Sequence, residues 1–184
     1  WKSNEYSKNE VHLRKLASSG QSPSTMVISC CDSRIHATSI FGADEGEFFI
    51  HRNIANLVPM YSPDGENHGT SAAIEYAIKE LKVQHLIVLG HKDCGGIKNG
   101  HNMHSNSANP NYEFINKWLS ILLPAYNKIQ KNVSEQKQIN QLEQESIKLS
   151  INNLFSFPFI KKAIEENSLA IYGLIHDIGS GNLK

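Results

Sequence analysis

Two short segments of the chain carry residue types that bind soft metal ions. The first contains Cys30, Asp32 and Arg34, and the second contains His91 and Cys94. Side chains two residues apart lie on one side of an extended backbone, so Cys30, Asp32 and Arg34 face the same way. The spacing of His91 and Cys94 lets both point at one centre across a strand-to-helix turn.

Two thiolates and one imidazole form a set of three zinc ligands. Three protein ligands leave a fourth tetrahedral position open, which is the pattern of a catalytic zinc rather than a structural one. The two thiolates balance the charge of the metal, so its bound water ionises less readily than in a site with neutral ligands. The neighbouring carboxylate of Asp32 can compensate for this weaker ionisation. Arg34 holds Asp32 ionised and oriented to accept a hydrogen bond from that water, and it keeps Asp32 out of the open position.

Each segment alone is weak evidence for a metal. Cys30 can be a small buried residue, and Asp32 with Arg34 can be a surface ion pair. Together, at the ends of two predicted parallel strands, the segments favour a metal centre. Cys31 faces away from Cys30 on an extended backbone and is predicted to be a core thiol. Four other histidines are predicted to be solvated: His12, His68, His101 and His104.

The elements that position these residues are indicated by runs of apolar residues. Four short runs predict buried strands, over residues 25–30, 47–51, 85–90 and 169–175. Apolar spacing predicts helices over residues 71–81, 114–123, 133–155 and 157–166, with a polar loop over 99–112. The alternation predicts an α/β fold in which functional groups lie past the carboxyl ends of the strands.

The whole chain, residues 1–184, is therefore expected to form a single domain. We expect a mostly parallel central sheet of about four strands, flanked by helices. Residues 1–19 are polar with sparse apolar positions and predict an N-terminal helical arm. The glycines near residues 179–181 predict a turn that leads into a C-terminal hairpin strand.

The composition limits the function classes. Of the 184 residues 40% are hydrophobic and 20% are charged, which is typical of a globular chain. Lys plus Arg and Asp plus Glu balance at 18 each, which argues against a nucleic-acid partner bound through bulk charge. No apolar run approaches the roughly 20 residues of a membrane span.

The cysteines bear on the compartment. Three cysteines, two of them adjacent, do not suit a disulfide framework and favour the cytoplasm or another reducing compartment. The chain begins with Trp1 rather than Met, so we expect a trimmed N-terminus in which no targeting segment is visible.

Four ordered motifs carry a resemblance to a known family. They read CCDSR at 30–34, GEFFIHRNIANLVP at 46–59, SAAIEYA at 71–77 and GHKDCGG at 90–96. With them the chain resembles the β-class carbonic anhydrases, in the plant-like branch of the family. Residues 172–181 are similar to the last strand and hairpin of that family.

The resemblance implies an enzyme that reversibly hydrates carbon dioxide to bicarbonate and a proton. It implies one Zn²⁺ per subunit on Cys30, His91 and Cys94, with Asp32 and Arg34 as the catalytic pair. It also implies a homodimer, or a higher oligomer of dimers, with the active site at the subunit boundary.

In the plant-like branch the substrate pocket falls on Gln21, Phe49, Ile54 and Tyr76, with the backbone of Gly95 nearby. An apolar slot suits carbon dioxide, and an amide donor stabilises charge that develops on its oxygen. The other branch has an aromatic residue of an inhibitory bicarbonate site where this chain has Val27. We therefore expect no bicarbonate-locked state.

Two alternatives stay open. Relatives with the same zinc site hydrolyse carbonyl sulfide or carbon disulfide, and turnover assays on the gases separate these reactions from hydration. A non-catalytic zinc-binding assembly module is the other alternative, although Asp32, Arg34 and Gln21 are superfluous in a structural site. The group that passes the proton to solvent is left open among His51, Tyr76 and the 99–112 loop.

Overall fold

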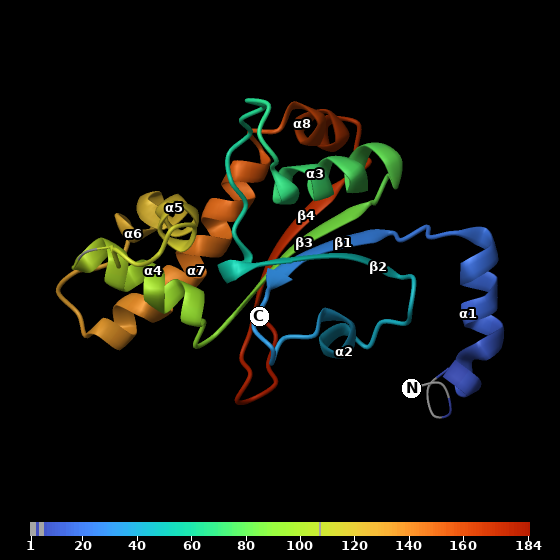
Figure 1. Cartoon of the computed structure of the whole chain (residues 1–184), viewed down its shortest axis with the longest axis horizontal. Helices are drawn as coiled ribbons and strands as arrows, with labels where there is room; N and C mark the ends of the chain where they lie inside the picture. Colours follow the sequence, from blue (N-terminus) through green and yellow to red (C-terminus); the bar gives the residue numbers. More distant parts are fainter. Residues whose placement is uncertain (1–2, 4–5, 107) are drawn as a thin grey trace.

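The computed structural model describes residue 3, residues 6–106 and residues 108–184, and its centre is a four-stranded sheet (Figure 1). The strand order is β2-β1-β3-β4, and each neighbouring pair is parallel. The strands are β1 (Thr25–Cys30), β2 (Phe48–Asn53), β3 (His85–His91) and β4 (Ala170–His176). The predicted α/β class and four-stranded parallel sheet are confirmed.

Strand β1 is buried along its whole length, because it has a strand on each edge and a layer of side chains on each face. Met26 and Ile28 pack into one apolar cluster and Val27 into another, as alternating side chains of a strand must. β1 and β3 pair in register as far as Ser29 and Leu89. Their carboxyl ends therefore meet at one edge of the sheet.

Helices cover both faces of this sheet (Figure 1). One face carries α3 (Gly69–Glu75), the π-helical turn η3 (Tyr76–Glu80), α7 (Glu135–Leu154) and α8 (Pro158–Glu165). Their buried Ile74, Ile147 and Ile160 pack in one cluster against the strands. The other face carries the short helix α2 (Ala37–Phe41), whose Ala37 packs with Val27.

A helical layer extends beyond the carboxyl edge of the strands. After the turn η2 (Ile54–Asn56), it contains α4 (Gly95–Ser105), α5 (Ile115–Leu119), η4 (Ser120–Leu122) and α6 (Leu123–Tyr126). Together with α7 these elements enclose an apolar cluster that includes Cys30 and Cys94. The candidate ligands thus lie between the sheet and this layer.

Two predictions for the helical layer are wrong. The loop expected over residues 99–112 is helical through Ser105, and residue 107 lies outside the described residues. His101, expected to be solvated, is only 4% exposed. It lies one helical turn after the buried Ile97, and its Nε2 is 2.9 Å from Oε1 of Gln138.

Two helix boundaries also differ from expectation. The helix expected over 71–81 begins earlier, at Gly69, and its last turn widens into the π-helical turn η3. The helix expected to end near Pro124 is followed by α6, which has this proline in its first turn. Proline is tolerated there because the first helical N–H groups have no intrahelical partner.

The N-terminal helix α1 (Ser7–Ser19) has no buried residue and stands apart from the sheet (Figure 1). It touches the loop before β2, where His12 Nε2 lies 3.0 Å from the carbonyl oxygen of Glu45. An arm was expected over residues 1–19, and residues 1, 2, 4 and 5 lie outside the described part of the chain.

The C-terminal segment turns back on β4. Ile175 and Lys184 exchange two backbone hydrogen bonds, of 2.8 and 3.1 Å, and His176 forms an antiparallel bridge with Leu183. This is the expected hairpin. Among the described residues, no helix combines the length and the apolar character that crossing a membrane requires.

Candidate metal centre

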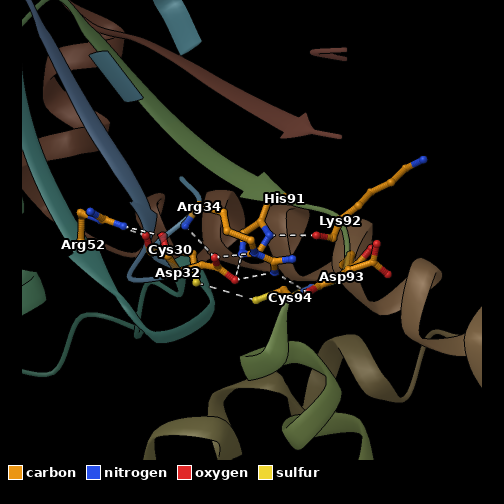
Figure 2. Close-up of polar contacts among 9 residues, drawn as sticks. Cys30, Asp32, Arg34, Arg52, His91, Lys92, Asp93 and Cys94 are labelled. Carbon is orange, nitrogen blue, oxygen red and sulfur yellow. Dashed lines mark hydrogen bonds and ion pairs between the residues drawn. The ribbon is translucent and has the colours of Figure 1, made fainter. Parts of the chain in front are cut away.

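Cys30, His91 and Cys94 converge at the carboxyl edge of the sheet (Figure 2). Cys30 ends β1, His91 ends β3, and Cys94 immediately precedes α4. Their ligand atoms all lie within 4.8 Å of one another, and the two sulfurs are 3.8 Å apart. The three side chains that the sequence proposed as ligands are therefore brought together and buried.

The imidazole of His91 is prepared to act as a ligand through Nε2. Its Nδ1 donates a hydrogen bond to the carbonyl oxygen of Lys92, at 2.9 Å. Nε2 is buried and has no hydrogen-bond partner among the described residues. Burying the Nε2 lone pair without a hydrogen-bond donor costs free energy, unless a cation binds to it. This arrangement fits a metal ion at the centre.

The two thiols favour a state with one proton between them. A hydrogen bond with Cys94 lowers the pKa of Cys30, and backbone N–H groups of Asp32 and Ala55 lower it further. The same thiol contact, together with burial, raises the pKa of Cys94. Releasing the second proton therefore requires a nearby positive charge, which a divalent metal supplies.

Asp32 and Arg34 lie directly beside this centre (Figure 2). Asp32 Oδ1 accepts from Arg34 Nε at 2.9 Å, and Oδ2 accepts from Nη2 at 2.7 Å. These hydrogen bonds hold the pKa of Asp32 well below its usual range. Oδ2 also lies 3.9 Å from His91 Nε2, so the carboxylate faces the centre as an anion.

Two further charged residues contact the loops that carry the ligands. Arg52 donates from Nε to the carbonyl oxygen of Cys30 at 3.0 Å and from Nη2 to that of Asp32 at 2.7 Å. Glu143 on α7 accepts the backbone N–H of Cys94 at 3.1 Å, and burial raises the pKa of its carboxyl group.

Glu143 was not predicted to have a role, although its position in the sequence carries one signal. Glu143 lies four residues after Ile139 and four before Ile147, within the apolar stripe of its helix. An acidic residue on such a stripe has to be buried, and a buried carboxylate needs hydrogen-bond donors. The sequence could not identify the donor, because Cys94 is 49 residues away in the chain.

Of the proposed substrate residues, Ile54 and Gly95 lie near the metal centre. Gly95 follows Cys94 as the first residue of α4. Ile54 packs closely on Gly96, since a methyl group added there would lie 2.8 Å from Ile54 Cγ2. Trp118 Nε1 donates to the carbonyl oxygen of Ile54 at 2.8 Å and fixes this segment.

Gln21, Phe49 and Tyr76 lie elsewhere in the chain's own fold. Phe49 pairs with Met26, four residues before the end of β1, which corresponds to about 13 Å along the strand. The rings of Phe49 and Tyr76 are 5.8 Å apart, and Gln21 is exposed before β1 begins. A parallel sheet places these residues toward the edge opposite the metal centre.

The prediction that Cys31 is a core thiol is wrong, because this residue is exposed. β1 ends at Cys30, and the backbone N–H of Cys31 bonds to the carbonyl oxygen of Asn53 at 2.9 Å as the chain turns. Strand alternation therefore does not extend to residue 31. His12 and His68 are exposed as predicted, whereas His104 is half-buried.

Known proteins resemble this chain in sequence and structure. A family model described as carbonic anhydrase matches residues 25–183. Beta carbonic anhydrase 3 of Arabidopsis thaliana is 39% identical over 184 residues, covering 98% of this chain and 70% of that protein. A structure from a study of two tetrameric beta-carbonic anhydrases of Sordaria macrospora gives a TM-score of 0.83 at 32% identity, covering 100% of this chain and 90% of that one. The structure of the beta-carbonic anhydrase CcaA gives a TM-score of 0.86 at 26% identity, covering 98% of this chain and 80% of that one.

Proposed function

This chain belongs to the β-class carbonic anhydrase family, and from that premise we propose that it hydrates carbon dioxide with one Zn²⁺ held by Cys30, His91 and Cys94. The observation that carries the proposal is the convergence of two sulfurs and one imidazole nitrogen beside an oriented carboxylate. A structural zinc site uses four protein ligands and has no need of that carboxylate.

When bound, Zn²⁺ supplies the Lewis acidity that makes water a nucleophile near neutral pH. The chain supplies the orientation. Arg34 holds both oxygens of Asp32, so the carboxylate stays next to the centre without becoming a ligand. Asp32 accepts a hydrogen bond from the attacking water and fixes its direction. Ile54, 43% exposed, offers an apolar wall for carbon dioxide.

We propose that a second copy of the chain completes the pocket. Gln21, Phe49 and Tyr76 lie too far from the chain's own Cys30 to touch a substrate there, and Tyr76 is 47% exposed. In a homodimer, these residues of one copy would face the metal centre of the other. The proteins of the Sordaria macrospora study are described as tetrameric, which supports an assembly built from dimers.

The assembly is tested by replacing Phe49 with Ala. The variant is expected to keep one zinc per chain, because Phe49 is remote from the ligands, and to lose hydration activity. Replacing the exposed Phe155 with Ala serves as the control. Sedimentation must show at least a dimer for the wild type. A fully active monomer would contradict the proposal.

Hydration itself is tested by stopped-flow measurement of proton release from carbon dioxide, paired with metal analysis. A chelator is expected to abolish activity, and added Zn²⁺ to restore it. Cys94→Ala is expected to lose both zinc and activity, and full retention of both would show that the ligand assignment is wrong. Turnover of carbonyl sulfide by the same samples separates hydration from the related hydrolysis.

We also propose that the enzyme works in a reducing compartment such as the cytoplasm. The sulfurs of Cys30 and Cys94 lie 3.8 Å apart and must remain thiolates to bind the metal. Zinc content measured after purification with and without a reductant tests this requirement. Equal zinc content after exposure of the metal-free protein to oxidant would contradict it.

A further inference from the structure

Glu143 is the only buried carboxylic acid in the described part of the chain, with 3% of its surface exposed. It lies on α7, near the apolar cluster that includes Cys30 and Cys94. A carboxylate in such surroundings is retained only where donors compensate for the loss of water. The donor here is the backbone N–H of Cys94, 3.1 Å from Oε1.

The peptide group between Asp93 and Cys94 is held from both ends. Its N–H donates to Glu143, and its carbonyl oxygen accepts a hydrogen bond from Arg34 Nη2 at 3.2 Å. An anion thus lies at one end of the peptide dipole and a cation at the other. Both contacts are charge-assisted and resist rotation of the peptide plane.

This peptide follows a residue in an uncommon conformation. Asp93 has a φ of 56°, in the left-handed region that non-glycine residues rarely adopt. Such a conformation persists only where its surroundings enforce it. Rotation of the peptide plane would change φ of Cys94 and swing its sulfur away from Cys30 and His91. It would also move the carbonyl oxygen that Arg34 contacts.

We propose that Glu143 is a positioning residue that sets the direction of the Cys94 sulfur and couples it to the Asp32–Arg34 pair. The inference rests on the proposed function, because it concerns the site that would hold zinc. Glu143 acts through the Asp93–Cys94 peptide and does not itself touch metal or substrate. Loss of Glu143 therefore disturbs both the Cys94 ligand and the contact of Arg34 with the Asp93 carbonyl oxygen.

The test compares Glu143→Gln and Glu143→Ala with the wild type. Zinc affinity is measured by competition with a chelator, and the absorption spectrum of the cobalt-substituted protein reports the geometry around the metal. Both variants are expected to bind zinc about 10- to 100-fold more weakly, Glu143→Ala more so, because residues that orient metal ligands have effects of this size. Their cobalt spectra are expected to differ from that of the wild type.

Glu145→Gln is the matched control. Glu145 lies on the same helix, and its carboxylate is 2.6 Å from Nζ of the exposed Lys148. This variant is expected to bind zinc like the wild type. Circular dichroism of the metal-free proteins checks the fold. If Glu143→Ala does not fold, Glu143→Met takes its place, because it keeps a side chain of similar length without the acceptor oxygen.

Three outcomes would overturn the inference, and they are distinguishable. If the wild type binds zinc tightly and Glu143→Gln and Glu143→Ala both match it in affinity and cobalt spectrum, Glu143 has no positioning role and the proposed function stands. If the wild type itself binds no zinc, the proposed function fails together with the inference. Lower thermal stability with unchanged metal binding would show a purely structural residue and would also overturn the inference.

Discussion

Asp32 and Arg34 form a two-pronged ion pair next to the ligand cluster, with both carboxylate oxygens bound by one guanidinium group. The carboxylate also accepts the backbone N–H of Arg34, at 3.0 Å. The Asp32 side chain is 16% exposed, whereas that of Arg34 is 50% exposed. The pair therefore places its anion toward the centre and its cation toward solvent.

Arg34→Ala is expected to lower kcat/KM about 10- to 100-fold while the protein retains zinc, because Asp32 loses its orientation but the ligands stay. Arg34→Lys keeps the positive charge but loses the planar guanidinium that binds both oxygens of Asp32, so an intermediate loss of kcat/KM is expected. Stopped-flow hydration and metal analysis measure the two effects separately. Unchanged kcat/KM in Arg34→Ala would rule out the catalytic pair.

The neighbouring thiols provide a second prediction. Cys30→Ser is expected to lose zinc and activity, whereas Cys31→Ser is expected to keep both, because only Cys30 faces His91 and Cys94. In metal-free protein, an alkylating reagent is expected to label the exposed Cys31 first. Mass analysis of the labelled peptides checks this order, and equal zinc loss in the two variants would contradict the ligand set.

Adjacent glycines at the start of α4 give a third prediction. A methyl group at Gly96 would lie 2.8 Å from Ile54 Cγ2 and 3.1 Å from Ala55 Cβ, whereas at Gly95 it would meet no atom within 4 Å. Gly96→Ala is expected to lower the free energy of unfolding by about 1–3 kcal/mol. Gly95→Ala is expected to change it by less than about 0.5 kcal/mol. Urea unfolding measures both, and equal effects would count against this packing.

The fourth prediction concerns acid stability. Lys92 holds the pKa of Asp177 at about 2, helped by backbone N–H groups of Gly179 and Ser180. A folded-state pKa below the usual carboxyl range stabilises the fold above about pH 4, and the contribution disappears as the pH falls through the folded value. Asp177→Asn is therefore expected to be less stable than the wild type at neutral pH.

The same variant should approach the wild type in stability as the solution is acidified. Urea unfolding midpoints of both proteins, measured from neutral pH downward, test this convergence. A constant difference between the two midpoints would show that the Lys92–Asp177 pair does not cause the pH dependence. Asp64→Asn serves for comparison, because His68 rather than Lys92 holds the pKa of this carboxyl group low.

The elements that supply the candidate ligands were predictable because local signals determine them. The apolar run 25–30 has no polar alternation, so it has to lie between two layers, and its end fixes Cys30. The run 85–90 behaves in the same way and leads to His91. Parallel pairing then brings the two ends together without information about distant contacts.

The features that could not be predicted depend on packing between distant segments. His101 is buried because Gln138, on another helix, reaches its ring nitrogen. Glu143 meets Cys94 only after α7 docks beneath α4. The exposure of Cys31 depends on where β1 ends, and strand ends are read less reliably from sequence than strand cores.

The separation of Phe49 and Tyr76 from Cys30 has a genetic consequence if two copies share each pocket. A chain with a damaged ligand still offers its intact aromatic residues, and a chain with damaged aromatic residues still offers its ligands. Mixing two such inactive proteins would regenerate one working centre in each hybrid particle. Two defective alleles would then complement each other, which is not expected of an enzyme whose site lies within one polypeptide.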